Sequence, residues 1–343
     1  MRTKTIRCPS RTTTFAALGL FFLSLTACPG ELPPDGEPEA EASGPQLENG
    51  SFTAELNGFP IHYEVHGLGS VMMVVTNSWG LSLEGLRGLF RPLEQHLTLV
   101  YFDPRGMGES GAIREDSDMG MTAVREDFDA LRRHLELERV HAIGWSNGAT
   151  NLIQLASEKP ETLRSAIFVH TSPRFGAEDG AKIQEEYPEL VARSNELRQK
   201  LLDDAVPDEE KEALQRKLFL DDWFPQLFAD PEAGREMLPE IFGDAGFSYR
   251  HGLYANQEMP TYDLRDRLGT VMIAGAHDLL PAERTEELHA GIPDSRFVVF
   301  ENSGHFAMRE EPEKWQKVVL DFIAQVERDA KEEEERKEAG EER

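Results

Sequence analysis

Short apolar runs that alternate with amphipathic stretches constrain this chain more than any other feature. Continuous apolar runs of strand length are typical of parallel strands that are covered on both faces. The segments between them carry apolar residues at helical spacing, so the pattern indicates βαβ units. Six runs of this kind lie at residues 71–76, 97–102, 140–144, 165–170, 270–274 and 296–300.

Two more strands are expected before these six. Residues 51–56 and 60–65 flank Asn57-Gly58, which is a hairpin-turn signal. Together the segments predict an α/β fold, with an eight-stranded, mostly parallel sheet flanked by helices. The helices are expected at residues 83–93, 122–135, 148–157, 282–290 and 311–326.

One segment interrupts the alternation. Residues 176–262 contain leucines at helical spacing and no convincing strand, which predicts an all-helical insertion. The segment has 20 acidic and 9 basic residues, for a net charge of −11. Solvated helix faces explain such a charge, and a site for a cationic or amine-bearing group is the alternative.

Composition excludes several classes of protein. The 343 residues carry a net charge of −27, which would repel a phosphate backbone, so no nucleic-acid partner is expected. The two cysteines, Cys8 and Cys28, both lie among the first thirty residues. Disulfide scaffolds and thiolate metal sites in the body of the chain are therefore excluded.

The N-terminal segment has the features of a secretory signal. Residues 1–27 hold four basic residues and no acid, and the apolar run at residues 15–25 is too short to span a bilayer comfortably. Leu25-Thr26-Ala27-Cys28 resembles a bacterial lipobox. The resemblance implies cleavage before Cys28, which would leave a mature chain of net charge −31, and a lipid anchor on that cysteine. A soluble secreted protein is the alternative.

The segments next to the two ends are expected to lie outside the core. Residues 28–50 are rich in Pro, Gly and Glu and predict a disordered tether. Residues 331–343 form a mixed-charge tail, either a frayed helix or solvated chain, to which we assign no function. Pro29, rather than an acid, follows the cysteine, which by resemblance to enteric sorting implies the outer membrane of a bacterial cell envelope.

A glycine-flanked serine follows the third buried strand. Gly144-Trp145-Ser146-Asn147-Gly148 ends that strand and opens a helix, where a serine hydroxyl is exposed on a strained turn. The helix N-terminus and the Asn147 N–H favour a developing oxyanion. The alternative is an ordinary glycine-rich turn.

A serine nucleophile needs an imidazole base that a carboxylate orients, and two later strand ends offer both. Asp278 follows the strand at 270–274, and His305 follows the strand at 296–300. Because the carboxyl ends of parallel strands meet at one edge of the sheet, we expect Ser146, Asp278 and His305 to converge there.

With the serine motif, Asp278 and His305 in this order along the sequence, the chain resembles the α/β-hydrolase-fold serine hydrolases over about residues 51–326. Residues 103–110, DPRGMGES, also resemble the D-x-R-G-x-G-x-S loop of that family and of its proline iminopeptidases. The resemblance implies that Ser146 is the nucleophile, His305 the base and then the acid, and Asp278 its orienting carboxylate. It also implies a core at 51–175 and 263–330 with a cap at 176–262, and a structural loop pair of Asp103 and Arg105.

The chain departs from the family after its third strand. Where the family usually has His-Gly, this chain reads Thr76-Asn77-Ser78-Trp79-Gly80. The backbone N–H of Trp79 aligns with the second oxyanion donor, and that of Asn147 with the first. A serine in place of the glycine is expected to restrict the bend, although Asn77 tolerates unusual φ.

Three other histidines have structural interpretations. His277 is expected to be structural or at the surface, and His141 to be a satisfied core residue. His170 ends a strand at the active edge, so lining the pocket and a structural role are both open. No grouping has the spacing of HExxH and no dinucleotide fingerprint appears, so we expect no metal or redox cofactor.

These features predict a serine hydrolase that cleaves an ester or amide bond of a small molecule through an acyl-enzyme, with esters slightly favoured. One alternative is an aminopeptidase similar to proline iminopeptidases, in which a cap carboxylate grips the free amine. An alternative of another class is a non-catalytic binding lipoprotein with a relic triad.

Overall fold

The computed structural model describes residues 46–172, 177–258, 270–275, 278, 286, 289–290, 292 and 295–340. All of them belong to one compact unit, Glu41–Arg343. The lipobox cysteine Cys28, most of the expected tether, His277 and most of the expected helix at 282–290 lie outside the described residues.

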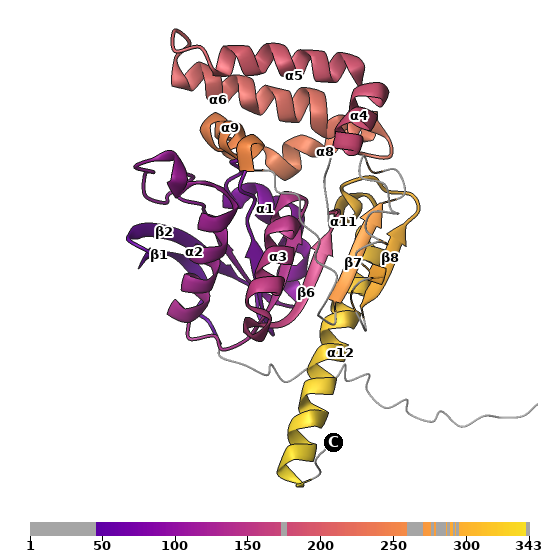
Figure 1. The fold of residues 1–343 in the computed structure, drawn as a ribbon. Helices are drawn as coiled ribbons and strands as arrows, with labels where there is room; N and C mark the ends of the chain where they lie inside the picture. The colour runs from indigo at the N-terminus through magenta and orange to yellow at the C-terminus, as the bar shows by residue number, and fades with distance from the viewer. Residues whose placement is uncertain are drawn as a thin grey trace, which may run out of the picture. The chain divides into compact units, whose positions relative to one another are not determined.

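Eight strands form a single sheet in the order β1-β2-β4-β3-β5-β6-β7-β8 (Figure 1). β1 pairs with β2 and β2 with β4 in antiparallel fashion, and every other pairing is parallel. The prediction of an eight-stranded, mostly parallel sheet is therefore confirmed. The strands are β1 (Gly50–Leu56), β2 (Phe59–His66), β3 (Val71–Val75), β4 (Thr98–Phe102), β5 (Val140–Trp145), β6 (Leu163–Val169), β7 (Thr270–Gly275) and β8 (Arg296–Phe300).

The first hairpin turns where its sequence predicted. Asn57 and Gly58, between β1 and β2, have φ angles of +51° and +81°. Two consecutive positive φ values are what a tight hairpin turn requires, and they suit Asn-Gly better than most pairs.

Helices cover both faces of the sheet, which explains why its central strands are apolar on both sides. One face packs against α2 and α3, and the other against α1 and α12. Among the described residues, the helices of the core are α1 (Leu83–Phe90), α2 (Gly120–His134), α3 (Asn147–Glu158), α11 (Ala307–Glu310) and α12 (Pro312–Glu338), with the short turns η1 (Arg91–Gln95), η2 (Asp116–Asp118) and η3 (Pro160–Thr162).

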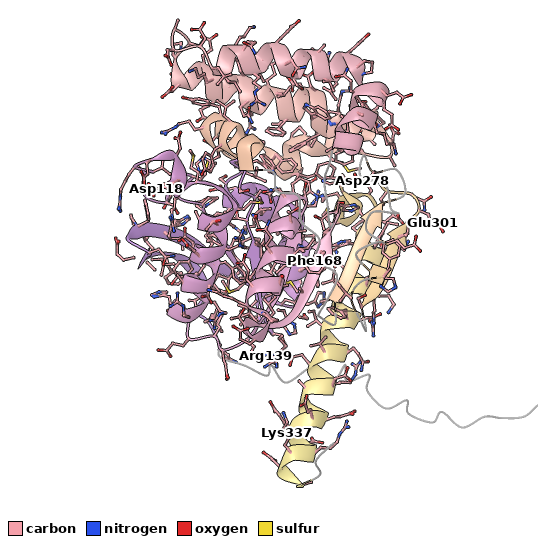
Figure 2. All side chains as sticks on the ribbon, in the orientation of Figure 1. Asp118, Arg139, Phe168, Asp278, Glu301 and Lys337 are labelled. Carbon is pink, nitrogen blue, oxygen red and sulfur yellow. The ribbon has the colours of Figure 1, made fainter. Side chains whose placement is uncertain are left out.

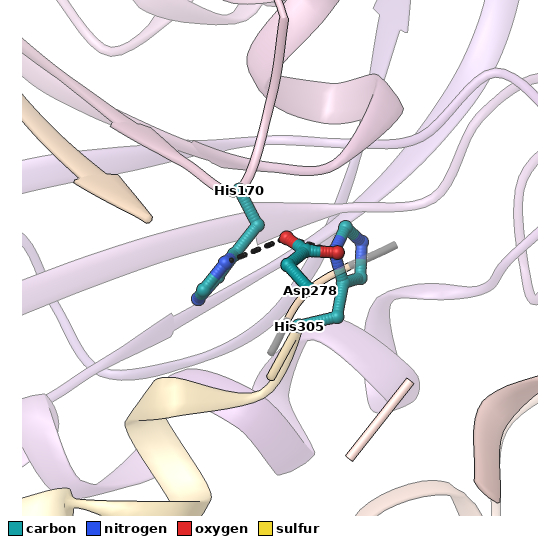
Figure 3. Close-up of side chains that lie close together, drawn as sticks. All are labelled: His170, Asp278 and His305. Atoms are coloured by element: carbon teal, nitrogen blue, oxygen red, sulfur yellow. Dashed lines mark hydrogen bonds and ion pairs between the residues drawn. The ribbon is translucent and has the colours of Figure 1, made fainter. Parts of the chain in front are cut away.

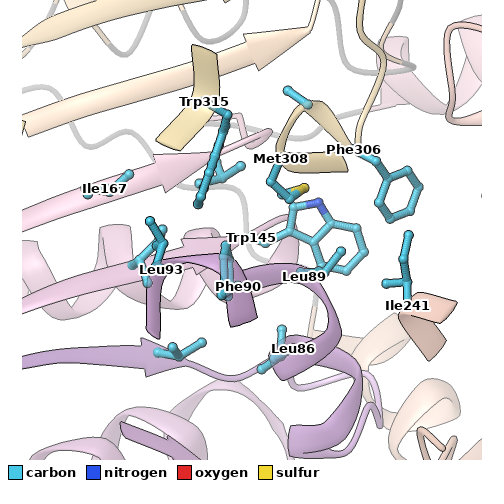
Figure 4. Close-up of a cluster of buried hydrophobic side chains, with 14 of the residues drawn as sticks. Leu86, Leu89, Phe90, Leu93, Trp145, Ile167, Ile241, Phe306, Met308 and Trp315 are labelled. Carbon is cyan, nitrogen blue, oxygen red and sulfur yellow. The ribbon is translucent and has the colours of Figure 1, made fainter. Parts of the chain in front are cut away.

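The core beneath α1 shows how the packing joins segments that are distant in the sequence. Phe90 and Trp315 stack with their ring centroids 5.9 Å apart (Figure 4). Both rings are fully buried, and burial of one large apolar side chain stabilises a fold by roughly 1.5–3 kcal/mol. This contact joins a helix that follows β3 to the C-terminal helix, which continues to Glu338. In its last turns, Arg336 pairs with Glu332 and Lys337 with Glu333.

The segment expected to be an all-helical insertion is helical in its described part. Its elements are α4 (Ala177–Glu186), α5 (Pro188–Leu201), α6 (Asp208–Lys217), the π-helix η4 (Leu218–Trp223), α7 (Phe224–Gln226), α8 (Pro231–Phe242) and α9 (Tyr249–Glu258). We call residues 177–258 the cap. Within it, α8 contacts α1 and α9 contacts α2, so the cap packs directly on the core.

A short backbone strap joins the cap to the loop after β3. Ser248 N donates to Gly80 O at 2.9 Å, and Ser82 N donates to Gly246 O at 3.1 Å. Leu81 and Phe247 form an isolated antiparallel bridge between these two bonds. We call residues 246–248 the strap. Among the described residues, no helix combines the length and apolar character needed to cross a bilayer.

Candidate active site

Ser146 occupies a strained turn between β5 and α3. Its backbone has φ +56° and ψ −123°, which a residue other than glycine adopts only at an energetic cost. The flanking glycines are required by close packing: a Cβ on Gly144 would lie 2.6 Å from Ala149 N, and one on Gly148 would lie 2.5 Å from Val75 O. The G-x-S-x-G pattern is thus explained by the geometry of the turn, which is that of a nucleophile elbow.

Asp278 and His305 contact each other directly. Nδ1 of His305 lies 2.9 Å from both carboxylate oxygens of Asp278, and both side chains are almost completely buried (Figure 3). Figure 2 labels Asp278 on the side of the core that faces the cap. Burial alone would raise the pKa of Asp278, but the neighbouring His305 and His170 lower it well below its ordinary value. The carboxylate is therefore ionised and can hold an Nδ1–H of His305.

His170 is part of the same cluster. It directly follows β6, and its Nδ1 lies 3.0 Å from Asp278 Oδ2 (Figure 3). Its φ of +51° is again unusual for a residue other than glycine. Burial lowers the pKa of His170, and the attraction of Asp278 opposes this only in part. Sequence reasoning placed His170 at the correct sheet edge but did not identify its partner.

The elbow is tied to the strands and loops that carry these residues. Trp145 Nε1 donates to His305 O at 2.9 Å, and the two rings lie 5.2 Å apart. Ser146 N donates to Val169 O at 2.9 Å, one residue before His170. The ends of β5 and β6 and the loop after β8 therefore meet at one edge of the sheet, as the parallel topology requires.

The loop after β3 is fastened to the elbow by a side chain. Asn147 Oδ1 accepts from Ser78 N at 2.7 Å and from Ser78 Oγ at 2.8 Å. The positive φ of this loop, +90°, is at Gly80 and not at Asn77 or Ser78. The expectation that Ser78 restricts the bend is therefore wrong, because the bend does not need a glycine at that position.

Trp79, next in this loop, contributes an aromatic wall. Its ring centroid lies 4.5 Å from that of Phe219, 6.2 Å from that of Phe224 and 6.3 Å from that of Phe247. Trp79 and Phe219 are only partly buried, while the other two rings belong to the core. Because Trp79 adjoins Ser78, which is bonded to Asn147, this aromatic cluster connects the cap to the loop that is fastened to the elbow.

Two residues of the 103–110 loop are structural, but they do not pair with each other. Arg105 makes a bidentate pair with Asp127, at 2.8 and 2.7 Å. Asp103 instead accepts from Leu83 N and contacts His62 Nδ1, each at 2.9 Å. The expected loop pair of Asp103 and Arg105 is corrected in this respect, because each side chain extends to a different element of the core.

His141 is a satisfied core residue, as expected. Its ring nitrogens lie 2.7 Å from Ser165 Oγ and 2.7 Å from Glu327 Oε1, so it links the sheet to α12.

His170, Asp278 and His305 also have the composition of a metal site, since one ligand atom from each lies within 4.8 Å of the others. The hydrogen bonds of 2.9–3.0 Å between their Nδ1 atoms and the carboxylate account for this clustering without an ion. The arrangement fits proton transfer better than coordination.

The family model described as alpha/beta hydrolase fold matches residues 65–312. The chain belongs to the alpha/beta hydrolase family. This alpha/beta hydrolase is 24% identical over 274 residues to a proline iminopeptidase of Heyndrickxia coagulans, covering 77% of this chain and 94% of the relative. It is 26% identical over 266 residues to a pimeloyl-(acyl-carrier protein) methyl ester esterase of Aeromonas salmonicida, covering 73% and 94%.

Solved structures agree on the fold. An alpha/beta fold family hydrolase from Bacillus anthracis superimposes with a TM-score of 0.66 at 22% identity, covering 80% of this chain and 99% of that one. The relatives of this alpha/beta hydrolase are hydrolases, and the chain is an enzyme of that family.

Proposed function

We propose that this enzyme is a serine hydrolase that cleaves an ester or amide bond of a small molecule through an acyl-enzyme. The observation that carries the proposal is the His305–Asp278 pair at the same sheet edge as the strained Ser146. A hydroxyl on such a turn is exposed to substrate, and an imidazole whose Nδ1–H is held by a carboxylate has its Nε2 free to accept a proton.

The reaction proceeds in two halves. Ser146 Oγ attacks the substrate carbonyl while His305 Nε2 takes its proton, and the resulting imidazolium is stabilised by ionised Asp278. His305 then donates that proton to the leaving alcohol or amine. Water, deprotonated by the same imidazole, attacks the acyl-enzyme. The bond from the acyl carbon to Ser146 Oγ breaks, Oγ receives the proton from His305, and the acid is released.

The oxyanion is stabilised by two backbone donors. We assign them to Asn147 N–H, at the start of α3, and to Trp79 N–H, in the loop that Ser78 fastens to the elbow. One oxyanion donor contributes about 10²–10³ in kcat. A complex with a tetrahedral mimic whose oxygen lies out of reach of Trp79 N–H would remove that assignment.

Esters with a small apolar acyl group are the favoured substrates. The support is the pair of partly buried rings of Trp79 and Phe219, which connects the cap to the loop that Ser78 fastens to the elbow. An apolar wall favours uncharged groups because burial of a charge without a partner is costly.

Labelling with a fluorophosphonate tests the nucleophile. Wild type should label, while Ser146→Ala and His305→Ala should not, with p-nitrophenyl acetate turnover lost in parallel. If a folded wild type fails to label, the proposal is overturned in favour of a non-catalytic binding protein with a relic triad.

A proline-iminopeptidase-like aminopeptidase is the second candidate. It is supported by the similarity to proline iminopeptidases and by the acidic cap. Turnover of proline p-nitroanilide in preference to p-nitrophenyl acetate would favour it. A preference for N-acetylated over free-amine substrates would exclude it.

We also propose that the mature enzyme begins at Cys28 and is lipid-anchored in the bacterial envelope, at the outer membrane. The support is the sequence Leu25-Thr26-Ala27-Cys28-Pro29 after an apolar run. Incorporation of labelled palmitate should be lost in Cys28→Ala, and incorporation that survives in this variant would contradict the anchor.

A further inference from the structure

Two imidazoles hold one buried carboxylate. Asp278 Oδ2 lies 3.0 Å from Nδ1 of His170 and 2.9 Å from Nδ1 of His305, and Oδ1 lies 2.9 Å from the same atom of His305 (Figure 3). The rings of the two histidines are 5.3 Å apart. His305 has a place in the proposed reaction, and His170 does not.

The position of His170 is fixed by strand pairing and by burial. Trp145 of β5 pairs with Val169 of β6, so His170 directly follows the residue that holds the backbone of Ser146. His170 is 1% exposed, and its φ of +51° is a conformation that glycine or asparagine adopts more easily. This unfavourable backbone conformation places the imidazole of His170 within hydrogen-bond distance of Asp278.

The contact requires a specific protonation state. Asp278 is ionised and therefore acts only as an acceptor, so Nδ1 of His170 must carry a proton. A fully buried imidazole resists a positive charge, so the neutral ring with Nδ1–H fits best. Among the described residues, Tyr187, before α5, and Glu310, on α11, also interact electrostatically with this carboxylate.

We propose that His170 is a positioning residue for the hydrolytic reaction. Its Nδ1–H fixes the rotation of the Asp278 carboxylate, and the carboxylate in turn fixes the imidazole of His305 with Nε2 toward Ser146. Loss of the His170 donor would remove one of the contacts that orient the carboxylate, and the imidazole base would be oriented less well. This inference rests on the proposed function.

Two substitutions separate the donor from the backbone. His170→Asn keeps an N–H donor where Nδ1 stands and tolerates the positive φ, whereas His170→Gly relieves the φ but removes the donor. We expect H170N to keep kcat within about threefold of wild type, because the hydrogen bond to Asp278 is retained. We expect H170G to lower kcat at least tenfold with little change in KM, since the ground-state contacts to substrate are unaffected.

The separation of kcat from KM distinguishes positioning from general support. A folded H170G enzyme should bind substrate as wild type does but turn it over more slowly. H170N should keep both constants near their wild-type values. A merely structural role would instead lower the activity in proportion to the folded fraction, and the activity would follow the melting temperature.

A readout without turnover keeps the inference separate from the proposed function. In ¹⁵N-histidine-labelled wild type, downfield Nδ1–H proton resonances of His170 and His305 should be visible, each assigned by its substitution. The His305 resonance should persist in H170N and broaden or disappear in H170G. If it is unchanged in H170G, His170 does not position the pair and the inference is overturned, whether or not Ser146 labels.

Discussion

The side-chain oxygen of Asn147 accepts two hydrogen bonds from Ser78, one from the backbone N–H at 2.7 Å and one from the hydroxyl at 2.8 Å. Asn147 directly follows Ser146, and Ser78 directly precedes Trp79. The two residues assigned as oxyanion donors are therefore joined through one side chain. The departure from the usual His-Gly sequence of the family replaces a glycine with a residue that forms this link.

Loss of the link should affect turnover more than binding. Asn147→Ala removes both bonds, so we expect kcat to fall about 10- to 100-fold with KM nearly unchanged, because oxyanion geometry matters chiefly in the transition state. Ser78→Ala removes only the hydroxyl bond and should cost about fivefold, the equivalent of about 1 kcal/mol. Steady-state kinetics with p-nitrophenyl acetate measure both. Wild-type kcat in a folded Asn147→Ala would contradict the role of the link.

A second hydrogen-bonded Ser–His–Asp relay lies elsewhere in the core. It allows a test of whether such a relay alone activates a serine. Ser51 Oγ lies 2.9 Å from His62 Nε2, and His62 Nδ1 lies 2.9 Å from Asp103 Oδ2. Ser51 is exposed on strand β1, whose extended backbone lacks the strained turn of Ser146 and a helix N-terminus behind it. We therefore expect Ser51→Ala to label with fluorophosphonate as wild type does, and Ser146→Ala to remain unlabelled. Residual labelling of Ser146→Ala that disappears in the double variant would show that the relay suffices.

The stability of the protein should fall in mild acid partly because of His251. Burial lowers the pKa of His251 from 6.5 to about 4, while its hydrogen bond to Arg105 O opposes this in part. The unfolded chain binds the proton first, so the stability contribution is complete above the unfolded pKa and is lost as the pH falls from 6.5 toward 4. The full loss is about 3 kcal/mol.

His251→Gln provides the matched control, since its amide N–H can replace the Nε2 donor to Arg105 O. Urea unfolding of the two proteins across this range should show a steeper decline for wild type. Parallel curves would contradict the contribution of His251.

Glu212 should have the opposite dependence. Burial raises its pKa from 4.5 to about 7, although the backbone N–H of Tyr249 donates to it. Ionisation is then easier in the unfolded chain, so stability falls as the pH rises from 4.5 through about 7. Glu212→Gln keeps an acceptor for Tyr249 and should be more stable than wild type in mild alkali, by about 1–2 kcal/mol after allowance for solvent screening. Thermal unfolding of the pair should converge in mild acid; a constant difference would contradict the titration.

Much of the fold could be predicted because buried parallel strands appear in the sequence as continuous apolar runs. β5 and β8 were located to within one residue, and the serine of the elbow was found from its two glycines. Contacts between side chains that are far apart in the sequence produce no comparable sequence pattern. His170 and Asp278 are 108 residues apart, and only the tertiary packing of β6 and of the segment after β7 brings them together. For the same reason the pairing of Asp103 with Arg105 was wrong, since Asp127 on α2 contributes the carboxylate that Arg105 needs.

The strap at residues 246–248 determines where caps can be exchanged between relatives of this enzyme. Gly246 and Ser248 form backbone hydrogen bonds with Ser82 and Gly80. The strap is therefore bonded to the core, although its residues lie near the C-terminal end of the cap. A chimera that replaces the whole cap would sever bonds that hold the loop of Trp79. A junction placed before Gly246 would transfer helices α4 to α8 and leave the loop of Trp79 and its backbone bonds intact.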